Sequence, residues 1–307
     1  MRAINRLSHF LLKDRLHSMA AAFVLAYVPF VGSFSILIAG VVTLLKGAEE
    51  GAWALFATIL PFVIGCGISI ALGHPMGPAF AGLGIVALGN SLVWFFILLL
   101  RRFGHWNVLL DVAIVLGVAL IVVLHDMYPH IGDWWQDHLT QFFNNNVAAV
   151  RGNLPPDAAA NISAQAILSI KPFATGFVVA GLLINTLLQV GLARWWQFLI
   201  TGKGRLRSEL LHIRLSFTTG ILFLLVAIAS YWRNDTVIDA VPVVVGIFGL
   251  AGLSLIHYVL SGIKYAWIGL ILLYVLIMVL LPLSIGIVAV IGLLDVFVHF
   301  RKRWAIP

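Results

Sequence analysis

The sequence predicts an all-α polytopic membrane protein with about eight to ten transmembrane helices, some short or re-entrant, and an extracytoplasmic amphipathic helical insertion. Of its 307 residues, 62% are hydrophobic and 10% are charged, and the mean hydropathy is +1.05. Soluble domains have about 25% charged residues, so this chain has too few charges to cover a water-facing surface. Much of its surface must therefore face lipid, and the lipid bilayer is its first expected partner.

Long apolar blocks set the number of crossings, because a transmembrane helix needs about 20 apolar residues. The blocks are 18–45, 51–72, 76–100, 108–124, 172–200, 215–232, 237–260 and 265–298. The first block contains Pro29 and the last contains Pro282, each followed within a few residues by serine. Proline removes a helix hydrogen bond and often marks a kink or a turn. Each of these two blocks is therefore expected to form either two crossings or a re-entrant hairpin.

The positions of Lys and Arg decide the orientation. When both end blocks are divided, sixteen of the nineteen Lys and Arg residues fall on one side, and Arg151, Lys171 and Arg233 fall on the other. Cytoplasmic loops carry an excess of Lys and Arg. We therefore expect a multi-pass protein of the bacterial cytoplasmic (inner) membrane with both termini in the cytoplasm. The basic residues sit at helix ends rather than along one folded face, which argues against nucleic acid as a partner.

One long polar segment, residues 125–171, separates two halves of apolar sequence and is expected outside the cytoplasm. Its hydrophobic residues recur at helical spacing: Trp135, Leu139, Phe142, Phe143, Val147 and Val150. Charged and amide side chains lie largely off this stripe, which is typical of a helix on a membrane surface. A break around Pro155 precedes a second expected helix over 158–170. The chain thus divides into transmembrane residues 1–124, the insertion 125–171 and transmembrane residues 172–307.

Polar residues inside the apolar blocks are the candidates for a binding site, because such groups are costly in a membrane. We expect Asn90, Asn185 and His257 to line a cavity that binds a small molecule and opens outward. His74, in the turn that joins two apolar blocks, is expected near its mouth. The alternative is structural, since amides can hydrogen-bond between helices and a histidine can be satisfied inside the core.

Two acidic residues near block ends, Asp111 and Asp295, are expected to reach water or to pair with Arg101, Arg102 or Arg301. Paired in this way, both carboxylates would be structural. The competing interpretation is a functional site, which is the default for an ionisable residue within a membrane.

Histidines and aspartates alternate at the start of the polar segment, where His125, His130 and His138 occur. Histidine with carboxylate suits a divalent metal, but this spacing matches no established ligand motif, so a solvated acidic face is expected. The sequence also has no Ser-His-Asp order, P-loop or paired acidic motif. We therefore expect no cofactor, no metal site and no enzymatic activity.

The C-terminus suggests a family. Gly292-Leu293-Leu294-Asp295, followed by His299-Phe300-Arg301-Lys302-Arg303, resembles the terminal signature of the YybS-like membrane proteins of bacteria, a family without a settled function. The layout is similar over nearly the whole chain. The YybS-like family is grouped with proteins similar to the substrate-binding S components of energy-coupling-factor vitamin transporters.

This resemblance implies an S-component-like arrangement over residues 1–124. In S components, small residues four apart on the first helix pack against a membrane-protein partner, and Ala22 and Ala26 have this spacing. The chain departs from the S-component pattern by its greater length and its polar segment, so vitamin uptake is not implied. Two functions follow as expectations: a transport-related protein that binds a small molecule, or a scaffold that holds other envelope proteins.

Overall fold

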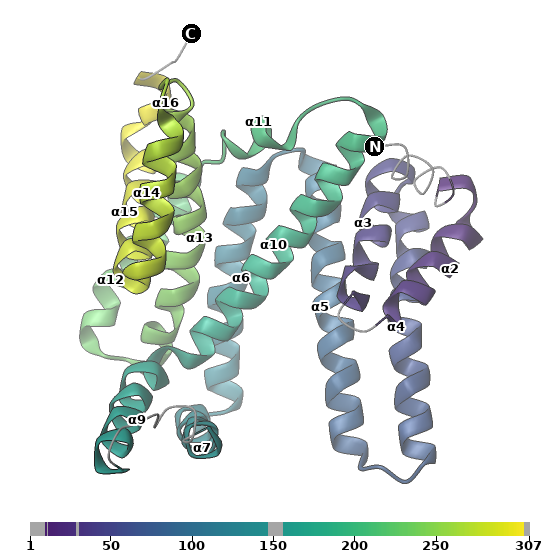
Figure 1. The fold of residues 1–307 in the computed structure, drawn as a ribbon, viewed down its shortest axis with the longest axis horizontal. Coiled ribbons are helices and arrows are strands. Elements are labelled where there is room, and N and C mark those ends of the chain that lie inside the picture. The colour runs from purple at the N-terminus through teal and green to yellow at the C-terminus, as the bar shows by residue number, and fades with distance from the viewer. Residues whose placement is uncertain (1–9, 11, 29–30, 147–155, 304–307) are drawn as a thin grey trace. The chain divides into compact units, whose positions relative to one another are not determined.

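The computed structural model describes residue 10 and residues 12–28, 31–146 and 156–303, and within them every regular element is a helix (Figure 1). Five helices are long and apolar enough to cross a membrane: Ala48–Ala71, Met76–Phe103, Trp106–Met127, Asn161–Thr201 and Asp235–Leu260. Further apolar helices in the described residues are shorter: Arg15–Ala26, Gly32–Lys46, Phe217–Trp232, Ala266–Val279 and Leu283–Val298. The chain is an all-α polytopic membrane protein, as its composition predicts.

The helices pack into two compact units. The first comprises Met1–Leu109 and Ile184–His212, and the second comprises Leu110–Leu183 and Ile213–Pro307. The unit boundaries fall inside α6 (Trp106–Met127) and α10 (Ala174–Thr201). They therefore differ from the boundaries at 124 and 171 drawn from polarity, because packing groups helices by contact and not by their order in the chain.

In the first unit, the first apolar block forms a hairpin of two short helices, α2 (Arg15–Ala26) and α3 (Ser35–Lys46), with the turn η1 (Gly32–Phe34) between them. Each helix has 12 residues and so rises about 18 Å, against a hydrocarbon core of about 30 Å. Both helices, shown in purple in Figure 1, lie against α4 (Ala48–Ala71). The lengths favour a re-entrant hairpin over two crossings.

The C-terminal end of α3 accepts hydrogen bonds from two side chains of α5 and packs closely against α4. The Trp94 indole, on α5 (Met76–Phe103), donates to Oγ1 of Thr43 at 3.0 Å, and the Arg101 guanidinium donates to the carbonyl oxygen of Thr43. The turn into α4 uses Gly47 at φ +129°, and a Cβ on Gly51 would lie 1.7 Å from Oγ1 of Thr43. The first turn of α4 therefore lies so close to α3 that position 51 has room for glycine alone.

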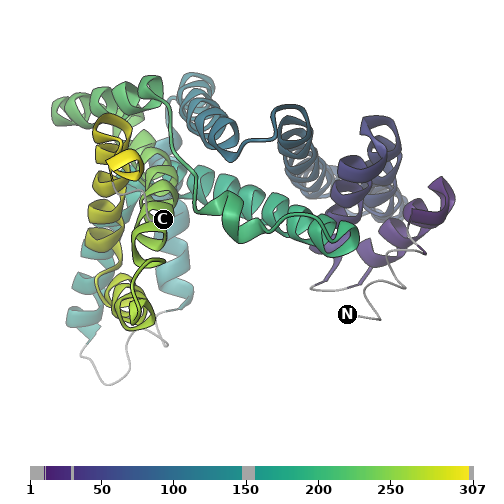
Figure 2. The ribbon, with the colours of Figure 1, turned by 90° about the horizontal axis from the view of Figure 1, so that it is seen from above.

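In the second unit, α13 (Asp235–Leu260) and α15 (Leu281–Val298) lie side by side (Figures 1 and 2). Glycines allow this close crossing, since a Cβ on Gly252 would lie 1.9 Å from the carbonyl oxygen of Val288 and one on Gly292 would lie 2.5 Å from that of Phe248. The last apolar block divides at Leu280, and α14 (Ala266–Val279) precedes the break. The unit also contains α12 (Phe217–Ala229), η3 (Ser230–Trp232) and α16 (Phe300–Arg303).

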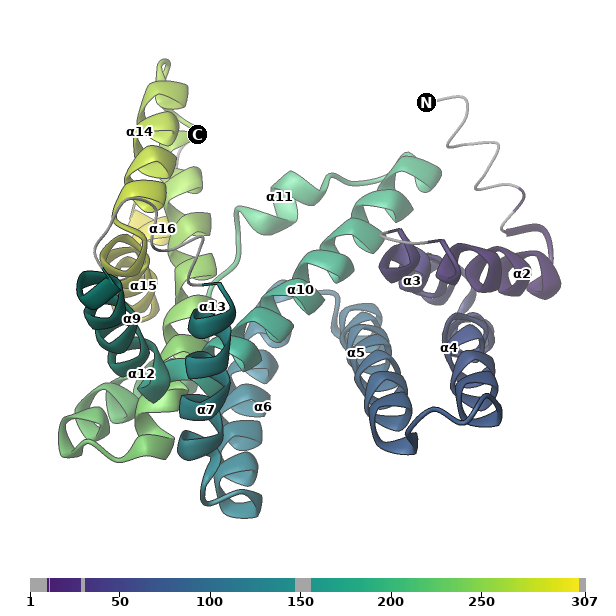
Figure 3. The ribbon, with the colours of Figure 1, turned by 60° about the horizontal axis from the view of Figure 1, so that its bottom comes forward.

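The polar segment forms two helices, α7 (Ile131–Asn145) and α9 (Pro156–Ile170), followed by the turn η2 (Lys171–Phe173). Figure 3 brings both helices to the front of the second unit. Trp135, Leu139 and Phe143 are half-buried, whereas Phe142 is 59% exposed, so the apolar stripe of α7 is narrower than expected. The predicted stripe positions Val147 and Val150 lie outside the described residues. The helix expected after the proline break is confirmed by α9.

Candidate functional site

Three helix ends of the second unit meet at one buried carboxylate, that of Asp239 in the second turn of α13. Asp239 is 4% exposed. Nε2 of His125, in the last turn of α6, donates to Oδ2 of Asp239 at 2.8 Å. The backbone N–H of Gly176, in the first turn of α10, donates to Oδ1 at 3.0 Å. Both carboxylate oxygens therefore have partners, and each partner comes from a different helix.

Helix dipoles support this arrangement. The N-terminus of a helix carries a partial positive charge and its C-terminus a partial negative charge. Asp239 lies near the N-termini of α10 and α13, and His125 lies at the C-terminus of α6. The partial positive charge at the N-terminus of α13 therefore lies on the side of the Asp239 carboxylate. A Cβ on Gly176 would lie 1.9 Å from the carbonyl oxygen of Asp239, so the hydrogen bond to Oδ1 requires glycine at this position.

Helix α7 is docked on the same first turn of α10. The indole Nε1 of Trp135 donates to Oγ1 of Thr175 at 2.9 Å, and Thr175 is itself buried. A second contact lies one turn earlier, where Nζ of Lys171 donates to Oε1 of Gln136 at 2.7 Å. The surface helix and the buried carboxylate thus hold neighbouring residues, Thr175 and Gly176.

The second unit has pockets of about 480 and 540 Å³, a size that suits a small ligand. The pocket of 540 Å³ opens at the corner between α6 and α7. Its lining is mainly apolar and aromatic: Leu124, Met127, Tyr128, Pro129, His130, Ile131 and Trp134. The Trp134 ring stacks on His138 with 3.8 Å between ring centroids. Leu124 precedes His125 in α6, but neither His125 nor Asp239 lines this pocket.

The structure does not assemble the expected cavity from the residues that the sequence singled out. Asn90 is half-buried on α5, Asn185 is exposed on α10, and His74 is exposed in the turn between α4 and α5, all in the first unit. Within the described part of the chain, neither the Asn90 nor the Asn185 side chain makes a hydrogen bond. His257 belongs to the second unit.

His257 has hydrogen bonds to its own helix and to the next one. Its Nδ1 donates to the carbonyl oxygen of Leu253 at 2.9 Å, and its Nε2 lies 3.3 Å from the hydroxyl of Tyr274 on α14. These contacts tie α13 to α14 and satisfy both ring nitrogens. They give His257 a structural role, which does not depend on a ligand.

Ala22 and Ala26, the residues with the spacing of a partner-packing face, are 0% and 8% exposed. With Ser18 they form the buried face of α2. Ala22 packs in a cluster with Ile38 of α3 and Ala57 of α4. Ala22 and Ala26 therefore pack against other helices of this same chain.

Asp295 pairs with Arg301, as the structural interpretation predicts. Nη1 of Arg301 donates to Oδ2 of Asp295, Nη2 donates to Oγ of Ser254 at 3.0 Å, and the backbone N–H of Phe300 donates to Oδ1 at 3.1 Å. Burial lowers the pKa of Arg301, and the carboxylate of Asp295 opposes this effect. These contacts hold the C-terminal end of α15, and both carboxylate oxygens of Asp295 have a hydrogen-bond donor.

Asp111 has different partners from those expected. Its Oδ1 accepts hydrogen bonds from the backbone N–H of Ser216 at 3.0 Å and from the hydroxyl of Thr219 at 2.7 Å. These groups form the first turn of α12, so Asp111 satisfies backbone donors that a helix N-terminus leaves free. Asp111 therefore has the structural role that was one of the two expectations, with Ser216 and Thr219 as its hydrogen-bond donors.

Sequence reasoning missed the site at Asp239. It treated His125 as part of a solvated face and did not single out Asp239, since each lies at an end of an apolar block. The available signal was the position of Asp239 inside the block 237–260, after an apolar valine and isoleucine. Nothing in the spacing connects it to His125, which lies 114 residues away.

Comparison with protein-family models, curated proteins and solved structures finds no match to this chain. The similarity to YybS-like proteins and to S components therefore stays a prediction.

Proposed function

We propose that this protein is a transport-related, multi-pass protein of the bacterial cytoplasmic membrane that binds a small molecule at the α6–α7 corner and responds to protons through His125 and Asp239. The buried pair is the observation that carries the proposal. Ionisable residues within transmembrane bundles are costly, and they commonly mark substrate paths and proton relays. The pocket of 540 Å³ at the α6–α7 corner supplies the space for a ligand.

The charge distribution of the second unit supports an outward position for α7. The end of this unit that includes α16 holds Arg214, Lys264 and Arg301, whereas the end that includes α7 holds four exposed aspartates with Lys171 and Arg233. These aspartates are Asp126, Asp133, Asp137 and Asp235. Basic residues concentrate on the cytoplasmic side. The pocket then opens outward, and both termini lie in the cytoplasm.

The lining of the pocket indicates the ligand class. Its walls are apolar and aromatic, with Tyr128 and His130 as the ionisable lining residues, and exposed carboxylates lie on the same surface. Aromatic faces attract cations, and nearby carboxylates add to this attraction. An amphipathic small molecule with an apolar body and a cationic head fits both features.

Proton response follows from the contacts of α10. Histidine is the side chain that ordinarily changes charge near neutral pH. A proton on Asp239 weakens the two hydrogen bonds that its carboxylate accepts, one from Nε2 of His125 and one from the N–H of Gly176 in the first turn of α10. The same turn holds α7 through Trp135. The protonation state of the pair is thereby linked to the helix that borders the pocket.

Ligand binding can be tested by thermal unfolding of the reconstituted full chain in the presence of a panel of cationic amphipathic compounds. Compounds that bind the corner pocket should raise the melting temperature of the wild type and have little effect on Trp134→Ala. Trp267→Ala is the matched control, because Trp267 is also exposed but does not line this pocket. Equal stabilisation of both variants would exclude the pocket as the binding site.

The proton link needs a separate measurement. Titration calorimetry of a bound compound in buffers with different ionisation enthalpies gives the number of protons exchanged on binding. We expect a non-zero number for the wild type and a loss of this exchange in Asp239→Asn, which keeps the size of the side chain. If Asp239→Asn exchanges the same number of protons as the wild type, the His125–Asp239 pair has no part in the proton exchange. The pocket would still stand as the binding site.

The hairpin of α4 and α5 favours a second candidate function, the holding of a membrane-protein partner. A Cβ would meet no heavy atom within 4 Å at these glycines: Gly65, Gly67, Gly73, Gly77, Gly82, Gly84 and Gly89. Small residues let transmembrane helices approach closely. Leucine at Gly82 and Gly89 should then abolish co-purification of a fixed partner without lowering the melting temperature. Retention of that partner would speak against this surface.

A further inference from the structure

We propose that the loop from Gly202 to Arg207, between α10 and α12, binds the phosphate headgroups of anionic lipids. The side chains of Lys203, Arg205 and Arg207 are exposed, and no carboxylate of the described residues pairs with them. The planar fork of donors on arginine binds phosphate as well as carboxylate. The inference does not depend on the proposed transport function.

Two glycines and an aromatic ring fix the course of the loop. α10 ends at Thr201, and Gly202 and Gly204 follow with φ of +64° and +88°, which side chains with a Cβ rarely adopt. A Cβ on Gly204 would lie 2.6 Å from a ring atom of Phe198. The chain therefore turns back over the last turn of α10 in one defined conformation.

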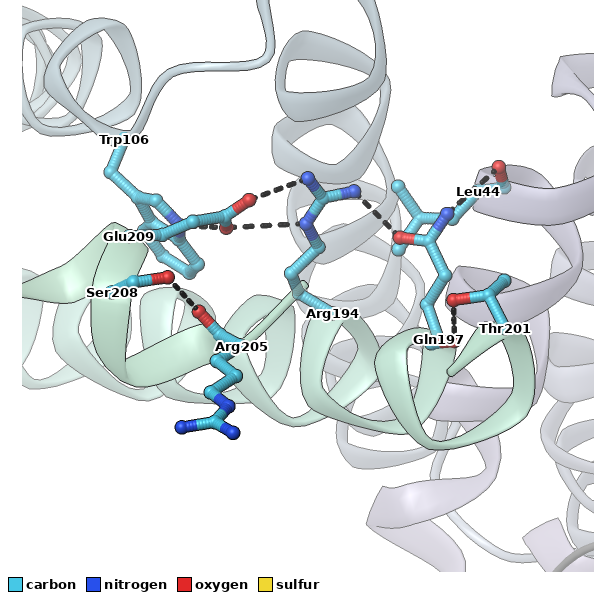
Figure 4. Close-up of polar contacts among 8 residues, drawn as sticks. All are labelled: Leu44, Trp106, Arg194, Gln197, Thr201, Arg205, Ser208 and Glu209. Carbon is cyan, nitrogen blue, oxygen red and sulfur yellow. Dashed lines mark hydrogen bonds and ion pairs between the residues drawn. The ribbon is translucent and has the colours of Figure 1, made fainter. Parts of the chain in front are cut away.

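An ion pair holds the far end of the loop, at α11 (Leu206–Leu210). Nη2 and Nε of Arg194 donate to the two oxygens of Glu209 at 2.6 and 3.2 Å, and the Trp106 indole donates to Oε2 at 3.0 Å (Figure 4). The Arg194 guanidinium also lies 4.5 Å from the Phe198 ring centroid. The bidentate pair and the stacking anchor α11 on α10.

The same network leaves the loop with uncompensated positive charge. Glu209 is the only acidic residue between Gly202 and Arg214 in the sequence, and Arg194 neutralises it. In Figure 4, the Arg205 guanidinium points away from the network. The outward face of the loop thus presents three cations on a backbone that is already fixed, so little conformational entropy is lost when an anion binds.

The depth of the loop selects a lipid as the source of the phosphate. Trp195 is 47% exposed on the last turns of α10, and exposed tryptophans concentrate at the membrane–water interface. Six residues separate Trp195 from Thr201, a rise of about 9 Å. The headgroup layer extends roughly 5–8 Å beyond the hydrocarbon core on each side. The loop therefore lies near the outer edge of the headgroup layer, and the long side chains of Lys203, Arg205 and Arg207 can reach back to the lipid phosphates.

The test compares lipid binding by the purified full chain in neutral detergent, using native mass spectrometry and thermal unfolding. Phosphatidylglycerol should bind and raise the melting temperature, whereas phosphatidylcholine and inorganic phosphate should have little effect. Lys203→Gln/Arg205→Gln/Arg207→Gln should weaken phosphatidylglycerol binding about ten- to a hundredfold, since it removes three charge-assisted hydrogen-bond donors to one headgroup. Stabilisation by inorganic phosphate equal to that by phosphatidylglycerol would overturn the assignment to lipid.

Two controls separate a built site from general positive charge. Lys13→Gln/Arg102→Gln/Lys264→Gln removes the same number of exposed charges elsewhere and should leave phosphatidylglycerol binding within about twofold of the wild type. Gly204→Ala keeps every charge but strains the loop, and it should weaken binding. Equal losses in the two triple variants, or full binding by Gly204→Ala, would show that no specific site exists.

Discussion

Nε2 of His125 on α6 donates a hydrogen bond to the buried carboxylate of Asp239 on α13, although 114 residues separate the two in the chain. Asp239 also accepts the N–H of Gly176, so the pair joins three helices whose apolar faces alone would not fix their relative depth. A hydrogen-bonded pair of this kind sets a register, because both groups lose their partners if one helix slides by a turn.

Removal of the carboxylate should be strongly destabilising. In Asp239→Ala, the N–H of Gly176 and the imidazole of His125 lose their buried acceptor, and we expect the free energy of unfolding to fall by about 2–4 kcal/mol. His125→Ala added to this variant should cost less than it does alone. Reversible unfolding in lipid–detergent mixtures measures both effects. Asp137→Ala, at an exposed position of α7, is the control and should change stability little; comparable losses in the two aspartate variants would contradict the structural role of the pair.

The close approach at Gly176 gives a second prediction. Alanine at this position places a methyl group against the carbonyl oxygen of Asp239, so α10 and α13 must separate, and we expect a loss of about 1–3 kcal/mol. Gly181→Ala on the same helix meets no heavy atom within 4 Å and should be neutral or slightly stabilising. Melting temperatures of the two variants decide the matter. Similar values would show that the helices are not in contact at Gly176.

The re-entrant hairpin should depend on the group that holds its end. Arg101→Gln removes the charged donor to the Thr43 carbonyl, and a loss of about 1–2 kcal/mol is expected. Trp94→Phe removes the other donor to Thr43 and keeps an aromatic ring. Limited proteolysis of the first unit should accelerate in both variants. The neighbouring Arg102→Gln removes an exposed charge and should behave as the wild type; if it is cleaved as rapidly as Arg101→Gln, the role assigned to Arg101 is wrong.

Cysteine labelling in intact cells tests the topology. In a Cys66→Ala background, a membrane-impermeant thiol reagent added outside should label His130→Cys, because His130 is exposed at the α7 end. It should not label Phe103→Cys, which the orientation places in the cytoplasm. Ser33→Cys should also stay unlabelled from outside, since a hairpin of 12-residue helices does not reach the far surface. Labelling of Ser33→Cys from outside would establish two crossings.

Sequence patterns predicted the elements better than the contacts between them. The 3.6-residue stripe around Trp135 and Leu139 located α7, and the proline break located the start of α9. The pairing of Asp295 with Arg301 was also predictable, because the two residues are six positions apart. By contrast, Asn90, Asn185 and His257 were chosen for being polar in apolar blocks, and that criterion does not say which residues face one another.

The sequence by itself determined the membrane class, the breaks at the first and last apolar blocks and the surface helix, because hydrophobicity and its periodicity are local properties of the chain. The first block was left with two solutions, and the end of α2 at Ala26 favours the re-entrant one. Only the tertiary structure decided that Asp239 receives His125 and Gly176, and that Glu209 receives Arg194 and Trp106. These groups are brought together by how the helices pack, and helix packing depends on the matching of surfaces far apart in sequence.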